Sequence, residues 1–145
     1  MIWRVRMILE SALLCLSFAV YFESRNESIE ARTAIAEVTM VRSDHNQNNI
    51  CKEVYRKGAF GWVKGNRNNN THYLKIVNSH KQPGNRKAWD ESKQLAKKVI
   101  LGKHKKALPK KASHFYNPRI DPKPKWATHK NYVATIGAHR FYYVK

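Results

Sequence analysis

Apolar residues recur at three- and four-residue steps near the start of the chain, the spacing of one face of an α-helix. This pattern predicts a mostly buried helix over residues 3–22. Its apolar residues are Val5, Ile8, Leu9, Ala12, Leu13, Leu16 and Val20. Asn26 suits a turn, because asparagine tolerates the left-handed conformation. Ser28 is a fair N-cap, with Glu30 in the first turn, so a second helix is expected over about 28–43.

The middle of the chain shows helical patterns separated by polar loops. Short helices are expected over 50–56 and 71–79, and a firmer one over 86–101 that stops at Gly102. The lysine-rich segment 103–111 contains a proline, so it is predicted to be a solvated loop rather than a helix.

The last third of the chain changes character. Segments 112–118 and 136–143 are short, aromatic and partly alternating, which is typical of strands, and these two strands could pair. Trp126 lies on their connection, which also contains prolines. The expected fold class is therefore α+β: a mainly helical single domain over residues 1–145 with a small C-terminal β element.

The positive charge of the chain is unevenly spread. The net charge is +18 over 145 residues, but residues 1–53 hold six Lys or Arg and seven Asp or Glu. The other 92 residues hold 22 basic residues against three acidic ones, a net charge of +19. Such a charge indicates an anionic partner, and nucleic acid, acidic lipid and anionic cell-wall polymers all qualify.

Cysteine and histidine give no sign of a metal site. Cys15 and Cys51 lack metal-ligand spacing, and the seven histidines are scattered, so no metal and no cofactor is expected. The two cysteines could pair if the first helix packs beside the segment that carries Cys51. Otherwise they are small buried residues.

The start of the chain has some features of a targeting signal. Arg4 and Arg6 precede an apolar run over 12–22, but that run is about half the length that a membrane span needs. Cleavage near its end would remove the helix that supports Glu23. We expect a core helix there, neither a signal peptide nor a transmembrane span.

Two carboxylates, Glu23 and Glu27, lie where the first helix gives way to the second. A break between helices can bury a catalytic acid and still leave it open to a substrate. Alternatively, both glutamates simply favour the N-terminus of the second helix through its dipole. The glycine-flanked aromatics Phe60 and Trp62 have two compatible interpretations as well, a hydrophobic plug or a stacking surface for a sugar ring.

Four blocks of the sequence resemble the SleB-type cell-wall hydrolases, the spore cortex-lytic enzyme family that also occurs in phage lysins. The first contains Tyr21-Phe22-Glu23-Ser24-Arg25-Asn26-Glu27-Ser28, between residues 14–16 and 34–38. The others, in the family's order, are 50–55 with 58–62, 112–116, and 124–126 with 136–142. The chain departs from the family pattern at Asn26 and Gly61, where glycine and serine are usual, and at 110–111, where a glycine-containing stretch is common.

The resemblance implies a lysozyme-like α+β domain that acts on the glycan strands of peptidoglycan, between N-acetylmuramic acid and N-acetylglucosamine. It implies that Glu23 is the catalytic acid, and it assigns a catalytic role to Glu27 less firmly. Cysteines recur in relatives at the positions of Cys15 and Cys51, which favours their pairing.

Glycosidic cleavage requires a proton donor to the leaving oxygen, and apolar surroundings help to keep a carboxylic acid protonated. A muramidase normally adds a second carboxylate, for which Glu27 is the candidate. Glu27 could instead be a structural partner of Arg25. The resemblance favours a lytic transglycosylase, which manages with one glutamate. The candidate substrate-binding residues are Tyr21, Phe60, Trp62, His114, Tyr116, Trp126 and His139.

Some of these candidates have structural alternatives. His114 and His139 could serve hydrogen bonding between the terminal strands, and Trp126 could belong to the core. The expected partners are peptidoglycan and anionic envelope polymers, with no specific nucleic acid, and the expected state is a monomer. We expect synthesis in the cytoplasm and action on the wall after release, as for a phage lysin. The rival hypotheses are a basic nucleic-acid-binding protein and a wall-binding module without catalysis.

Overall fold

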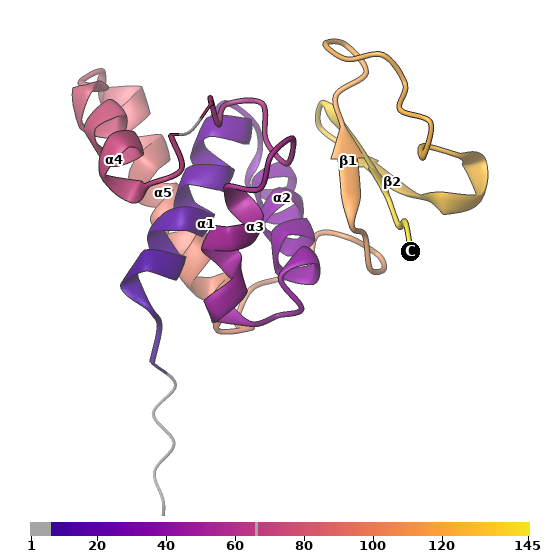
Figure 1. The fold of residues 1–145 in the computed structure, drawn as a ribbon, viewed down its shortest axis with the longest axis horizontal. Coiled ribbons are helices and arrows are strands. Elements are labelled where there is room, and N and C mark those ends of the chain that lie inside the picture. The colour runs from indigo at the N-terminus through magenta and orange to yellow at the C-terminus, as the bar shows by residue number, and fades with distance from the viewer. Residues whose placement is uncertain (1–6, 66) are drawn as a thin grey trace, which may run out of the picture.

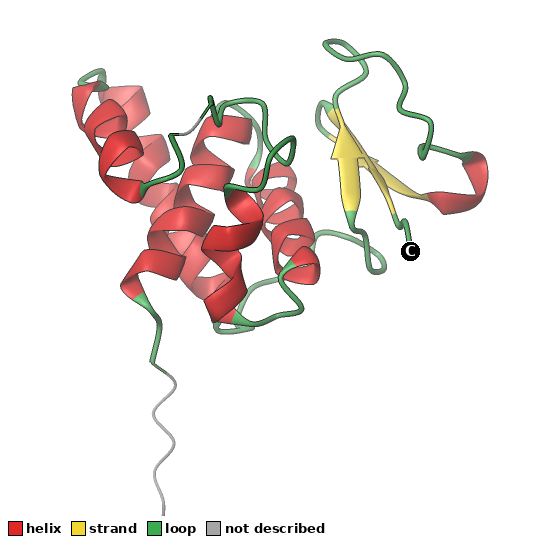
Figure 2. Cartoon of the chain, viewed as in Figure 1, coloured by secondary structure: helices red, strands yellow, loops and turns green. Residues whose placement is uncertain are grey.

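The computed structural model describes residues 7–65 and 67–145 and is a mainly helical α+β fold, as the sequence predicted. Figure 1 shows the helices on one side and the strands on the other, and Figure 2 separates them by colour. The α-helices are α1 (Glu10–Ser24), α2 (Ile29–Arg42), α3 (Ile50–Val54), α4 (Asn70–Ser79) and α5 (Pro83–Ile100). Two 3₁₀ turns, η1 (Gln47–Asn49) and η2 (His129–Asn131), accompany strands β1 (His114–Tyr116), β2 (Tyr132–Ile136) and β3 (His139–Tyr142).

Helix α1 lies at the centre of the helical part. Every residue from Cys15 to Tyr21 is buried, as expected for a helix that is apolar on all sides. One side of the core joins α1 to α2 and α3 through residues such as Leu16 and Val38. The other joins α1 to α4 and α5 through aromatic residues, including Phe18. No helix of the described residues is long and apolar enough to cross a membrane.

The sequence predicted most helices closely but misplaced some ends. Helix α1 begins at Glu10, and residues 3–6 of the expected helix lie outside the described residues. It continues to Ser24, so Glu23 lies in its last turn rather than in the break. Ser28 caps α2 as predicted, with its Oγ accepting the Ala31 N–H at 3.1 Å. Asn26 is in a turn, but it does not adopt the expected left-handed conformation.

The three strands form one antiparallel sheet in the order β1-β3-β2. The predicted strand over 136–143 was wrong as a single element, because it spans the end of β2, a hairpin turn and β3. Gly137 occupies that turn with φ +59°, a conformation that side chains disfavour. The run of apolar and aromatic residues hid the turn from the sequence pattern, so β2 was missed.

A disulfide between Cys15 and Cys51 joins α1 to α3. It decides between the two alternatives that the sequence left open for these cysteines. The bond closes a loop with a sequence separation of 36 residues, and that loop contains α2. The helix that carries Glu23 is therefore covalently fixed to its neighbour.

We predict that replacing both cysteines by alanine lowers the free energy of unfolding by about 3–4 kcal/mol, because the open loop gains entropy in the unfolded chain. Urea denaturation measures the loss. A reductant should shift the midpoint of the wild type and leave that of the double variant unchanged. Equal midpoints for the oxidised and reduced wild type would contradict the prediction.

Candidate functional site

Glu23 and Glu27 lie on either side of the point where α1 ends. Glu23 is in the last helical turn, and Glu27 is in the short connection to α2. Their side chains are 22% and 19% exposed, so both are partly shielded and still reach solvent. The connection is ordered by the Glu27 N–H, which donates to the Ser24 carbonyl at 2.9 Å, and by the Ser28 cap.

The imidazole of His139 lies between the two carboxylates. Its Nε2 is 3.3 Å from Glu23 Oε1, at hydrogen-bonding geometry. Its Nδ1 is 3.2 Å from Glu27 Oε2, an ion-pair distance without the alignment of a hydrogen bond. The His139 side chain is only 3% exposed. Because His139 opens β3, docking of the sheet is what completes this Glu–His–Glu cluster.

The two carboxylates differ in how firmly they are held. Glu27 Oε1 accepts the N–H of Ala138 at 2.8 Å, so both of its oxygens face the β2–β3 hairpin. A Cβ on Gly137 would collide with Glu27 Oε1, so only glycine permits this close approach. Glu23 Oε2, in contrast, has no partner among the described residues. Glu27 is fixed, and Glu23 is the carboxylate with a free oxygen.

A continuous aromatic wall leads from α1 to the histidine. Phe22 and Trp62 have ring centroids 5.0 Å apart, and Trp62 lies 5.7 Å from Phe60. Phe60 is 6.0 Å from Phe115, whose ring meets His139 edge-on at 5.3 Å. Phe60 is nearly buried and Trp62 is half-buried. The wall therefore fits both interpretations of the Phe60–Trp62 segment, since it plugs the core and presents Trp62 at the surface.

Two predicted contacts of the substrate lie in the interior. Tyr21 is fully buried, and its hydroxyl is 2.6 Å from His80 Nδ1. Burial raises the pKa of Tyr21 and lowers that of His80, which favours a neutral pair with the tyrosine as donor. Tyr116 is buried against Trp126 and Tyr142. Both positions suit support of the surrounding helices and strands rather than direct contact with a ligand.

His114 and Trp126 lie together, with ring centroids 4.8 Å apart, at a cavity separate from the two glutamates. His114 Nδ1 is 2.8 Å from Ser113 Oγ. Burial lowers the pKa of His114, and the positive charge of Arg42 lowers it further, while Glu53 opposes the shift. The predicted site residues thus divide among the glutamate cluster, this cavity and the interior.

Comparison with known protein families finds a match to the model described as Cell Wall Hydrolase, over residues 26–142. The chain belongs to the cell wall hydrolase family. The match includes Glu27, the aromatic segment with Phe60 and Trp62, and His139, and it begins three residues after Glu23. No curated protein and no solved structure matched the chain.

Membership of the cell wall hydrolase family makes the protein a peptidoglycan-degrading enzyme. A carboxyl group with one free oxygen, a buried imidazole and a fixed carboxylate form a chemically suitable cluster for such an enzyme. Glutamate and histidine are the usual carriers of protons in general acid–base catalysis.

Sequence reasoning missed the backbone contribution to the cluster. The Ala138 N–H and the bare backbone of Gly137 hold Glu27 from a position 111 residues away. The glycine between the β-branched segment 132–136 and the aromatic segment 139–143 was the available signal of a hairpin turn. The alternative that paired Glu27 with Arg25 was wrong, because the Arg25 guanidinium lies 5.1 Å above the ring of Tyr21 instead.

We predict that Gly137→Ala lowers the free energy of unfolding more than Gly102→Ala does. Both glycines have a positive φ, +59° and +69°, so both variants lose about 1 kcal/mol to backbone strain. Only the Gly137 variant also displaces Glu27, which adds about 1.5–3 kcal/mol for a lost charged hydrogen bond. Urea denaturation compares them, and equal losses would show that the Glu27–hairpin contact contributes nothing.

Proposed function

We propose that the enzyme cleaves the glycan strand between N-acetylmuramic acid and N-acetylglucosamine as a lytic transglycosylase, with Glu23 as general acid and then base. The proposal rests on one observation: the two glutamates beside His139 differ in how many of their carboxylate oxygens contact other protein groups. Glu27 has both oxygens directed at the hairpin and the imidazole, whereas Glu23 keeps one oxygen without a protein partner among the described residues.

The tautomer of His139 decides how a proton on Glu23 can be placed. A neutral imidazole has one N–H and one lone pair. In the tautomer that carries its proton on Nδ1, toward Glu27, the Nε2 atom of His139 is an acceptor 3.3 Å from Glu23 Oε1. When Glu23 carries a proton, it can donate that proton to His139 and turn it toward a substrate oxygen when the strand binds.

The fixed position of Glu27 favours the route with a single acid. A muramidase needs a second carboxylate that is free to activate water or to attack carbon, and Glu27 is already held by Ala138 and His139. In the proposed reaction Glu23 protonates the glycosidic oxygen and the bond to C1 breaks. Glu23 then takes the proton of the sugar's own 6-hydroxyl as that oxygen bonds to C1. Glu27 and His139 act as positioning residues.

The aromatic wall supports binding of a saccharide beside Glu23. Trp62 is half-buried and packs on Phe22, the neighbour of Glu23 in α1. An aromatic ring that is held edge and face by its neighbours offers a rigid surface to the apolar face of a sugar. We assign stacking to Trp62, with Phe60 behind it.

The disulfide supports action outside the reducing cytoplasm, because structural disulfides persist in oxidising compartments. Release of the chain in the manner of a phage lysin stays a prediction, as does its monomeric state.

Glu23→Gln is predicted to remain folded, because the side chain keeps its shape. It should lower the rate of cleavage by about 10²–10⁴-fold, because an amide cannot act as a general acid. Mass spectrometry of the soluble products from purified peptidoglycan provides the measurement. Anhydro-muramyl ends from the wild type alone support the proposal. The control is Glu30→Gln, at an exposed position of α2, which should retain full activity.

Three results of the same measurement would contradict the proposal. Full activity of folded Glu23→Gln would remove Glu23 from the mechanism. Reducing ends from the wild type would mean true hydrolysis and make Glu27 the second carboxylate. The absence of products from the wild type would bring forward the wall-binding and nucleic-acid-binding alternatives.

We predict that lysis of whole cell walls slows several-fold between about 20 and 300 mM salt, because attraction between the basic surface and anionic wall polymers is screened. The net charge of +18 is the source of this attraction. Turbidity of a wall suspension gives the rate. Cleavage of a short glycan fragment whose carboxylates have been converted to methylamides is the control, and its rate should change little. A rate on walls that does not depend on salt contradicts the prediction.

A further inference from the structure

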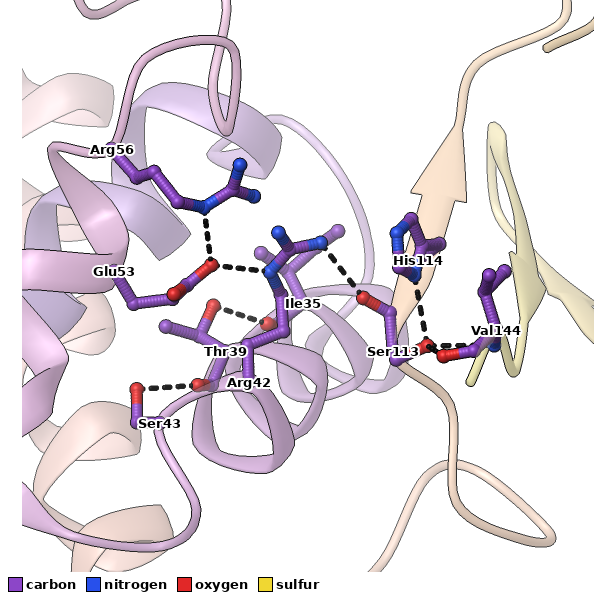
Figure 3. Close-up of polar contacts among 9 residues, drawn as sticks. All are labelled: Ile35, Thr39, Arg42, Ser43, Glu53, Arg56, Ser113, His114 and Val144. Carbon is purple, nitrogen blue, oxygen red and sulfur yellow. Dashed lines mark hydrogen bonds and ion pairs between the residues drawn. The ribbon is translucent and has the colours of Figure 1, made fainter. Parts of the chain in front are cut away.

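A polar cavity of about 240 Å³ lies between the helical part and the sheet, apart from the Glu23–His139–Glu27 cluster. Its walls come from α2, α3, the segment after α3, and β1 with the loop that follows it. Its lining includes Arg42, Glu53, Arg56, Phe60, His114 and Trp126. Figure 3 shows the guanidinium groups of Arg42 and Arg56 and the ring of His114 turned toward a common space.

The cavity holds more positive than negative charge. Glu53 Oε1 accepts from Arg42 Nε at 2.6 Å and from Arg56 Nε at 2.9 Å, so one carboxylate serves two guanidinium groups. Arg42 Nη1 also donates to the carbonyl of Ser113 at 3.0 Å. The Nη atoms of Arg56 have no partner among residues 7–65 and 67–145, and its side chain is 46% exposed. One positive charge therefore remains uncompensated, and free donors accompany it.

The opposite wall of the cavity is rigid and offers one more polar group. Ser113 Oγ accepts the N–H of Val144 at 2.8 Å and lies 2.8 Å from His114 Nδ1. This contact fixes the imidazole, and its Nε2 has no hydrogen-bond partner in the described part of the chain. The two arginines and the imidazole are thus held in place before any ligand arrives, which reduces the entropy lost on binding.

The cavity adjoins the glutamate cluster through shared aromatic rings. Phe60 and Phe115 both line the cavity. Phe115 meets the ring of His139 at 5.3 Å, and Phe60 lies 5.7 Å from Trp62. A glycan strand bound along the aromatic wall would therefore bring its own substituents to the cavity, which favours the substrate strand as the source of the ligand over a separate polymer.

We propose that this cavity is a subsite for a carboxylate group of peptidoglycan, bound by the free edge of the Arg56 guanidinium with Arg42 and His114 beside it. A guanidinium fork matches the two oxygens of a carboxylate, and a single uncompensated charge matches a single anion. The inference rests on the proposed function, because it takes the bound strand from there. Two carboxylates of the polymer have this chemistry, those of the stem peptide and the lactyl carboxylate of a glycan without peptides.

Direct binding to the Glu23→Gln variant tests the subsite, because that variant does not consume the ligand. The probes are a soluble disaccharide–peptide fragment with free carboxylates, the same fragment with its carboxylates converted to methylamides, and a peptide-free glycan oligomer. Isothermal titration calorimetry gives the Kd of each. We expect Arg56→Gln, added to Glu23→Gln, to raise the Kd of the carboxylate fragment about five- to tenfold and to leave that of the methylamide unchanged.

Two further variants separate the fork from general charge. Arg119→Gln removes the same charge from an exposed loop and should leave all three Kd values within twofold. Arg56→Lys keeps the charge and loses the fork, so its Kd should lie between those of the arginine and glutamine forms. If the Arg56 effect appears with the disaccharide–peptide, the stem peptide is the source. If the effect appears with the peptide-free oligomer, the lactyl group is the source of the bound carboxylate.

The inference is overturned if Arg56→Gln binds the carboxylate and methylamide fragments as its Arg56 parent does, or if none of the probes binds. Failure of the proposed function gives a different result. In that case the wild type yields no cleavage products, while the dependence of binding on Arg56 and on the carboxylate remains.

Discussion

The hydrogen bond from the Ala138 N–H to Glu27 is the contact on which the rest of the site depends. It joins the β2–β3 hairpin to the connection between α1 and α2 across 111 residues of sequence. The same contact brings His139 between the two carboxylates, and it requires a glycine at position 137. Neither the helices nor the sheet contains the cluster alone, so the site forms only when the two parts dock.

Polar contacts from α2 hold the C-terminal part against the helices. Arg42 donates to the carbonyl of Ser113 just before β1. Glu37 accepts the N–H of Leu108 at 2.9 Å and lies 2.8 Å from His104 Nε2, which fastens the lysine-rich segment to the same helix. Helix α1 is itself fixed by burial and by its disulfide. The catalytic candidates are therefore mounted on elements with little freedom, as positioning of reacting groups requires.

The sequence predicted what depends on local spacing and failed where docking decides. The α-helices follow from apolar periodicity. Glu23 and Glu27 are only four residues apart in the sequence, so their proximity at the end of α1 could be predicted. The position of His139 between them depends on the register of a hairpin, which a run of aromatic residues disguised. The Arg42–Glu53 ion pair joins two helices, so no local sequence pattern could predict it.

The positive charge of the molecule is of two physical kinds. The exposed lysines of segment 103–111 attract anions over a distance. At 0.1 M ionic strength, salt largely screens this attraction beyond about 10 Å. The guanidinium groups of Arg42 and Arg56 are held by Glu53, so a ligand there interacts at contact distance and is screened less. A polyanionic strand would thus be gathered by the first kind of charge and set in register by the second. Long-range attraction depends little on the exact positions of the lysines. The register of a bound strand depends instead on individual atoms of Arg56.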